Sequence, residues 1–178
     1  HYPLRRQRQM CIRDRSEMPT LLKLKKGMVP RPASVADCFG ARVEANALKF
    51  GQRSAIVFEG QEVNWSEFNA LANQYAHYLK SQGVQRGDTV SVIMENRIEF
   101  LALLVGVNKI GVTAGLINTN LTGKPLVHCI TVTHSKKCIF GSEVSGALNE
   151  VKDELGLTEG EDYFLSLIHI SEPTRRRG

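Results

Sequence analysis

The chain has 178 residues, a formal net charge of +5 and a hydrophobic fraction of 42%. This size suits one α/β domain or part of a larger one, and no apolar run approaches the roughly 18 residues of a membrane span. A basic balance would favour a nucleic-acid partner, but the excess positive charge lies at the two ends of the chain.

Both ends of the chain resemble translated sequencing-adapter DNA. Back-translation of residues 10–14 gives a string whose reverse complement, in another frame, encodes the Leu-Ser-Leu-Ile-His-Ile run at 165–170. Unrelated peptide segments are not expected to be reverse complements of each other. We therefore expect residues 1–15 and 165–178 to be adapter-derived and non-native. The alternative is a real basic tail and a real C-terminal strand.

Removing these segments changes the charge argument. Residues 1–15 carry a net +4 and residues 165–178 a net +2, so subtracting +6 from +5 leaves −1 for residues 16–164. A nucleic-acid partner is therefore not expected.

The cysteines inside this segment, at 38, 129 and 138, lack C-x-x-C spacing. This favours reduced thiols over a disulfide framework or a structural zinc site. We expect an intracellular protein, cytoplasmic or peripheral to a membrane, with its native N-terminus missing.

The first part of the chain predicts an arm, a helix and a hairpin. Residues 16–32 are expected to be a lead-in arm, since their prolines prevent one long helix. Ser34 is predicted to N-cap a helix over residues 35–50. Residues 54–58 and 62–65 are predicted to pair as a β-hairpin.

A second helix is predicted after the hairpin. Ser66 is expected to cap it, and Gly83 to end it. Its apolar side chains recur at helical spacing and form one stripe: Phe68, Leu71, Ala72, Tyr75 and Leu79.

The central stretch predicts a strand, a helix and a parallel strand. Residues 89–94 are apolar and rich in β-branched side chains, as in a buried strand. Residues 98–107 are apolar on nearly every face, as in a helix covered on several sides, and Gly111 is placed to end that helix. Residues 112–117 then form the next strand, followed by a polar loop at 118–120.

The remaining elements continue the alternation. A helix over residues 124–133 starts near Pro125, a strand covers 136–140, and an amphipathic helix covers 142–155. The predicted fold is therefore α/β, with a mainly parallel, doubly wound sheet, helices on both faces and a β-hairpin near the start.

Two clusters at predicted strand ends are candidate site residues. Asn118 and Asn120 would either hydrogen-bond a substrate or hold their own loop through Asx turns. Arg97 and Glu95 follow the preceding strand, where an Arg–Glu pair is expected to act as a structural clamp rather than as a catalytic acid or base. No catalytic residue and no metal ligand are predicted in this chain.

Several short strings give the chain a family resemblance: IVFEG at 56–60, MENR at 94–97, the block at 111–121 that ends in LINTNL, LVHC at 126–129 and FGSE at 140–143. With these strings the chain resembles the N-terminal region of AMP-forming acyl-CoA synthetases, and within them the branch of fatty acid transport proteins and very-long-chain acyl-CoA synthetases. The resemblance covers residues 33–164, which it identifies as the N-terminal part of an AMP-binding domain, an incomplete subdomain of an adenylate-forming enzyme.

The resemblance implies a parent enzyme that joins a fatty acid to coenzyme A through an acyl-adenylate. ATP, Mg²⁺ and CoA would be its cofactors, while the fragment is expected to be inactive and to bind none of them. The phosphate loop and adenine motifs of the family would lie beyond residue 164, with the rest of the large domain. Peripheral membrane association is left open. The alternatives are another adenylate-forming ligase, for an aryl, amino or short-chain acid, and a non-catalytic α/β interaction module.

Overall fold

The computed structural model describes residues 19, 22–24, 28, 37–156 and 162–165. The chain divides into two compact units, residues 1–36 and residues 37–178. Within the first unit, residues 22–24 are helical. The second unit contains the sheet and its helices. Of the two predicted adapter-derived segments, residues 1–15 lie outside the described residues, and only Leu165 of the other is described.

Among the described residues, the sheet of the second unit has four parallel strands, in the order β4-β3-β5-β6. Their bounds are β3 (Thr89–Ile93), β4 (Thr113–Leu116), β5 (Lys137–Phe140) and β6 (Tyr163–Leu165). The chain passes from β3 outward to β4 and then crosses back to β5 on the other side of β3. This reversal confirms the predicted doubly wound topology.

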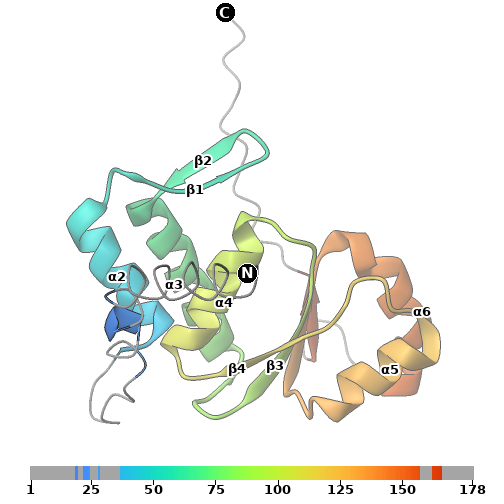
Figure 1. The fold of residues 1–178 in the computed structure, drawn as a ribbon. Coiled ribbons are helices and arrows are strands. Elements are labelled where there is room, and N and C mark those ends of the chain that lie inside the picture. Colours follow the sequence, from blue (N-terminus) through green and yellow to red (C-terminus); the bar gives the residue numbers. More distant parts are fainter. Residues whose placement is uncertain (1–18, 20–21, 25–27, 29–36, 157–161, 166–178) are drawn as a thin grey trace, which may run out of the picture. The chain divides into compact units, whose positions relative to one another are not determined.

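Helices cover both faces of the sheet (Figure 1). On one face lie α4 (Ile98–Lys109) and, packed on it, α3 (Trp65–Ser81) and α2 (Phe39–Phe50). On the other face lie α5 (Gly123–Val132) and α6 (Ser145–Leu155), the latter preceded by the 3₁₀ turn η1 (Ser142–Val144). The predicted arrangement of helices on both faces is confirmed.

A β-hairpin precedes α3, as predicted. Strand β1 (Ser54–Phe58) pairs antiparallel with β2 (Gln61–Asn64) through a two-residue loop. Both loop residues have positive φ, 49° at Glu59 and 79° at Gly60. Such φ values belong to type I′ turns, whose twist matches that of the paired strands.

Several helix starts differ from the prediction. Helix α2 begins at Phe39, because the Cys38 side chain caps it by accepting the Ala41 N–H; Ser34 lies outside the described residues. Helix α3 begins at Trp65 and is capped by Asn64 rather than by Ser66.

The later boundaries also shift. Pro125 is the third residue of α5 rather than the first, and residues 142–144 form the 3₁₀ turn before α6 begins. Strand β6 was not predicted.

Two hydrophobic cores lie on opposite faces of the sheet. The first joins α2, α3 and α4 to the hairpin and contains the predicted α3 stripe. The second joins α5 and α6 to the sheet, and its buried members include Leu126, Ile130, Leu148 and Val151. A fully buried side chain of this kind contributes about 1.5–3 kcal/mol of hydrophobic stabilisation.

Strand β3 supplies both cores because its side chains alternate between the faces. Val90 and Val92 belong to the first core, and Ile93 belongs to the second. Ser91, which is fully buried, hydrogen-bonds the hydroxyls of Thr133 and Ser135, each at 2.8 Å. Its hydroxyl is therefore satisfied despite its burial.

Among the described residues, no helix has both the length and the apolar character needed to cross a membrane.

Candidate functional site

The loops that leave β3 and β5 diverge at the carboxyl edge of the sheet. The two strands are neighbours, but the chain after β3 enters α4 on one face and the chain after β5 enters η1 and α6 on the other. In open α/β sheets, ligands bind in the crevice between such diverging loops. We call the position between these two loops the crevice, because this class of sheet favours a ligand there.

The side chain of Glu143 spans the crevice. Its Oε1 atom accepts the backbone N–H of Glu95 at 2.7 Å, and its Oε2 atom forms a salt bridge with the Nη2 atom of Arg97. The Arg97 and Glu143 side chains are 32% and 21% exposed. One carboxylate thus joins the loop after β3 to the turn after β5.

The salt-bridge partner of Arg97 is Glu143 rather than the expected Glu95. The role of Arg97 as a structural clamp stays a prediction. Glu95 contributes its backbone N–H to the contact with Glu143, not its carboxylate. The physical reason is topological, since the crossing of the chain makes β5 the neighbour of β3 and brings residue 143 opposite residues 95–97.

Gly141 provides the space for this contact. A Cβ atom added at Gly141 would overlap the Glu143 carboxyl group. The Gly141 N–H also donates to the Ile93 carbonyl at 2.9 Å, which continues the pairing of the two strands up to the crevice. A residue with a side chain at position 141 would force Glu143 away from its partners.

The hydrogen bonds of Glu143 decide its ionisation. Partial burial opposes the charged form, but the N–H of Glu95 and the guanidinium of Arg97 outweigh it and hold the pKa of Glu143 below its usual value of 4.5. The carboxylate is therefore charged at neutral pH.

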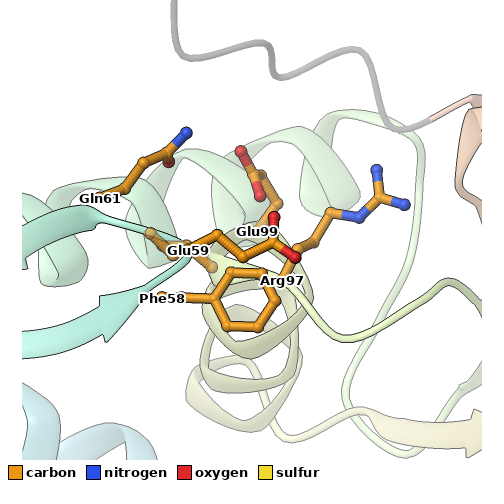
Figure 2. Close-up of a pocket in the computed structure, with 6 residues that line it drawn as sticks. Phe58, Glu59, Gln61, Arg97 and Glu99 are labelled. Carbon is orange, nitrogen blue, oxygen red and sulfur yellow. The ribbon is translucent and has the colours of Figure 1, made fainter.

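A hollow of about 230 Å³ adjoins Arg97 on the side of the hairpin. Figure 2 shows Phe58, Glu59 and Gln61 of the hairpin facing the start of α4, from which Arg97 and Glu99 project. Buried Ile98 completes the lining.

The chemistry of the hollow is limited. Its polar groups are two carboxylates, one amide and one guanidinium, with no thiol, hydroxyl or imidazole to act as a nucleophile. Within residues 37–156, 162–165 and the few described before them, no three His, Cys, Asp or Glu side chains group to hold a metal ion.

Asn118 and Asn120 lie together in the loop after β4. The Asn118 Oδ1 atom accepts the backbone N–H of Asn120 at 2.9 Å and its side-chain N–H at 3.2 Å. This is an Asx turn, the loop-holding role weighed above. Both residues are exposed, and their proximity to a substrate stays a prediction.

Glu143 was not predicted as a site residue. The available signal was the order Gly-Ser-Glu directly after a predicted strand, at the same sheet edge as the Glu95–Arg97 run. Because strand order was not predicted, nothing in the sequence indicated which two of the three loops would be neighbours.

Comparison with known proteins adds a family pattern and several relatives. The sequence model of a family described as "AMP-binding enzyme" matches residues 43–170 of this chain. The match therefore includes the first residues of the segment 165–178, which was predicted to be adapter-derived. The long-chain fatty acid transport protein 1 of Bos taurus is 36% identical over 107 residues, covering 59% of this chain and 17% of that protein. The medium/long-chain-fatty-acid–CoA ligase FadD6 of Mycobacterium tuberculosis is 29% identical over 135 residues, covering 76% and 22%.

A solved structure shares the fold. The fatty acyl CoA synthetase of Mycobacterium tuberculosis superposes with a TM-score of 0.66 and 26% identity, over 71% of this chain and 26% of that one. The chain thus spans about a fifth of the length of the two curated relatives and about a quarter of the solved one.

Proposed function

Because the chain belongs to the family of AMP-binding enzymes, we propose that it is part of a long-chain or very-long-chain fatty acyl-CoA synthetase. The observation that carries this proposal is the similarity to a long-chain fatty acid transport protein and to a fatty-acid–CoA ligase over the same α/β unit. The solved fatty acyl CoA synthetase supports it with the same fold.

The proposed reaction of the whole enzyme has two steps. The fatty acid carboxylate attacks the α-phosphate of ATP, which forms an acyl-adenylate and releases pyrophosphate. The thiol of coenzyme A then attacks the acyl carbon, forming the thioester and releasing AMP. ATP, Mg²⁺ and CoA are the cofactors that we propose for the whole enzyme.

We propose no binding site for these cofactors among the described residues. They provide no group of three metal ligands, and the crevice between β3 and β5 is spanned by Glu143, whose charge repels a triphosphate. We therefore assign no step of the reaction to a side chain of this chain. Its proposed part is to frame the large domain, with Asn118 and Asn120 as residues near the substrate.

Exposed apolar side chains support a role as part of a larger domain. Leu101, Leu116 and Val132 are 40%, 59% and 60% exposed. We propose that other parts of the whole enzyme cover these three apolar side chains.

We also propose that the enzyme is intracellular, either cytoplasmic or peripheral to a membrane. The free thiols of Cys38, Cys129 and Cys138 support a reducing compartment.

The decisive experiment recovers the full reading frame. The source DNA should be sequenced across the segments that encode residues 1–15 and 165–178. It should carry unrelated codons in place of both segments, and its reading frame should continue into a phosphate-binding loop. The recovered enzyme should exchange pyrophosphate into ATP with long-chain fatty acids, and more slowly with short-chain or aryl acids. A stop codon soon after residue 164, or a preference for aryl acids, would contradict the proposal.

The purified 178-residue chain should be inactive by itself. Because we assign no step of the reaction to a side chain of this chain, ATP–pyrophosphate exchange with a long-chain fatty acid should equal the rate without protein. The recovered full-length enzyme is the positive control in the same assay. Exchange above background by the short chain would show that a complete nucleotide site lies within these residues.

A further inference from the structure

Glu143 occupies a position that has the donors of an anion site. A backbone N–H, from Glu95, and a guanidinium, from Arg97, converge on one carboxylate. Each carboxylate oxygen interacts with one of these donors, so the carboxylate is held at two points. The position also lies between the diverging loops after β3 and β5, where this class of sheet binds ligands.

The surrounding charges explain why an attached carboxylate fills this position rather than a free one. Glu59 and Glu99 line the hollow beside Arg97, and both repel a dissolved anion. A carboxylate carried by the chain itself is present at a high effective concentration and loses no translational freedom on binding. Glu143 therefore has an advantage that a small free carboxylate lacks.

The local backbone is adapted to bring Glu143 back to these donors. The residue lies in the turn η1, two positions after Gly141, where a side chain would overlap the carboxyl group. Val144, the next residue, is buried in the second core and fixes the turn. The donors and the carboxylate are thus held on separate, well-packed elements.

We propose that Glu143 is an internal ligand of a carboxylate-binding site formed by Arg97 and the N–H of Glu95, and that it keeps free carboxylates out of the crevice. The site is self-occupied: removing the side chain vacates a receptor for a small carboxylate. This inference does not depend on the proposed enzymatic function, because every contact that carries it lies within the chain.

Chemical rescue tests the proposal. Glu143→Ala should lower the thermal unfolding midpoint, and sodium acetate should recover most of that loss relative to sodium chloride at equal ionic strength. Wild type should show no such difference between the salts, since its receptor is filled. Glu150→Ala, which removes an exposed glutamate from α6, is the matched control and should also be insensitive to acetate.

Two further variants and measurements keep the test decisive. The double variant Arg97→Ala/Glu143→Ala should lose the rescue, because it lacks the cationic half of the receptor. In Glu143→Ala the backbone amide resonance of Glu95 should shift on addition of acetate, whereas in wild type it should not. If Glu143→Ala is unfolded in chloride, recovery of its far-UV circular dichroism in acetate is the same test. An equal response of Glu143→Ala and Glu150→Ala to acetate, or no response of either, would overturn the proposal.

Discussion

Gly106 allows α3 and α4 to approach each other closely. A Cβ atom at this position would lie 2.6 Å from the carbonyl oxygen of Ala72 and 3.0 Å from the Cβ of Tyr75. Neither neighbour is the flexible end of a side chain, so one helix would have to move. We expect Gly106→Ala to reduce the free energy of unfolding by about 1–3 kcal/mol, measured by urea denaturation.

The same substitution at Gly146 provides the control. Gly146 lies in α6, is exposed, and has no atom within 4 Å of an added Cβ. Since alanine restricts the unfolded chain and favours helix, Gly146→Ala should raise the free energy of unfolding by about 0.5–1 kcal/mol. Equal effects at the two sites would show that α3 and α4 do not meet as described.

Cys138 should be chemically inert in the folded chain. It is 1% exposed, and burial raises the pKa of its thiol from the usual 9.0 to about 12. Because the folded pKa is raised, this thiol stabilises the fold below pH 9.0, and that stabilisation is lost as the pH rises toward about 12.

An iodoacetamide pulse followed by peptide mass spectrometry measures the reactivity. At neutral pH the exposed Cys38 should be alkylated in the native chain, whereas Cys138 should be alkylated only after denaturation. Similar rates for the two thiols in the native chain would contradict the described burial of β5.

The salt-bridge partner of Arg97 could not be predicted from the sequence, because it depends on which strands are neighbours. Glu95 is two residues from Arg97, and proximity in sequence made it the natural choice. Glu143 is distant in sequence and becomes a neighbour only because β5 lies beside β3. By contrast, the Asx geometry of Asn118 and Asn120 depends on residues two apart, and local sequence was enough to raise it as one alternative.

Among the elements, α3 has the best-defined start. Asn64 accepts the N–H of Glu67 at 2.9 Å, and the Glu67 carboxylate accepts the N–H of Asn64 at 3.0 Å. This reciprocal pair is a capping box, which satisfies two backbone donors that a helix leaves free. Asn64→Ala should therefore reduce the free energy of unfolding by about 1 kcal/mol, measured by thermal or urea denaturation.

Ser66→Ala is the informative comparison, because the sequence alone favoured Ser66 as the cap. In the structure Ser66 is the second residue of the helix, and its backbone N–H donates to the carbonyl of Gly51. Its replacement should change stability by less than that of Asn64. A larger loss at Ser66 would place the helix start where the sequence analysis put it.

Periodicity explains why most elements were predicted and why their ends were not. The stripe from Phe68 to Leu79 repeats at helical spacing within a helix of 17 residues, so the existence of α3 is unambiguous. Its first residue depends on which of two nearby polar side chains, Asn64 or Ser66, caps the helix, and in the structure Asn64 does so. Strand β6 has only three residues, too few to show a period.

At the scale of the whole sheet, an ion pair joins β3 and β5 at each end. At the amino edge, Asp88 Oδ2 accepts the Gln85 N–H at 2.7 Å and pairs with Lys136 Nζ at 3.1 Å. At the carboxyl edge, Glu143 pairs with Arg97. The Gln85 N–H and Lys136 lower the pKa of Asp88 below its usual value of 3.8.

Both carboxylates therefore link stability to pH in the same direction. A depressed folded pKa contributes stability that is present above the unfolded value and is lost as the pH falls through the folded value. We expect the urea midpoint to fall as the pH is lowered from neutral to below 3.8. In Asp88→Asn/Glu143→Gln this fall should be smaller, and an unchanged pH dependence in that variant would show that other groups cause it.

The architecture was predictable from the pattern of elements, whereas the function was indicated only by the family resemblance. Regular alternation of strands and helices indicates a doubly wound sheet without knowledge of any single contact. The described residues include no metal-ligand group from which a reaction follows. Only short strings shared with the family, such as MENR and LINTNL, indicated the type of reaction. These strings reflect common ancestry and do not by themselves explain a catalytic mechanism.

The alternation of side chains along β3 has a consequence for insertions and deletions. Val90 and Val92 face one core while Ser91 and Ile93 face away from them, so a single residue added or removed within the strand would exchange the two sets. The Ser91 hydroxyl would then enter an aliphatic layer, and a valine would meet the hydroxyls of Thr133 and Ser135. Strand β3 should consequently accept many substitutions that keep size and polarity, yet tolerate no change of length.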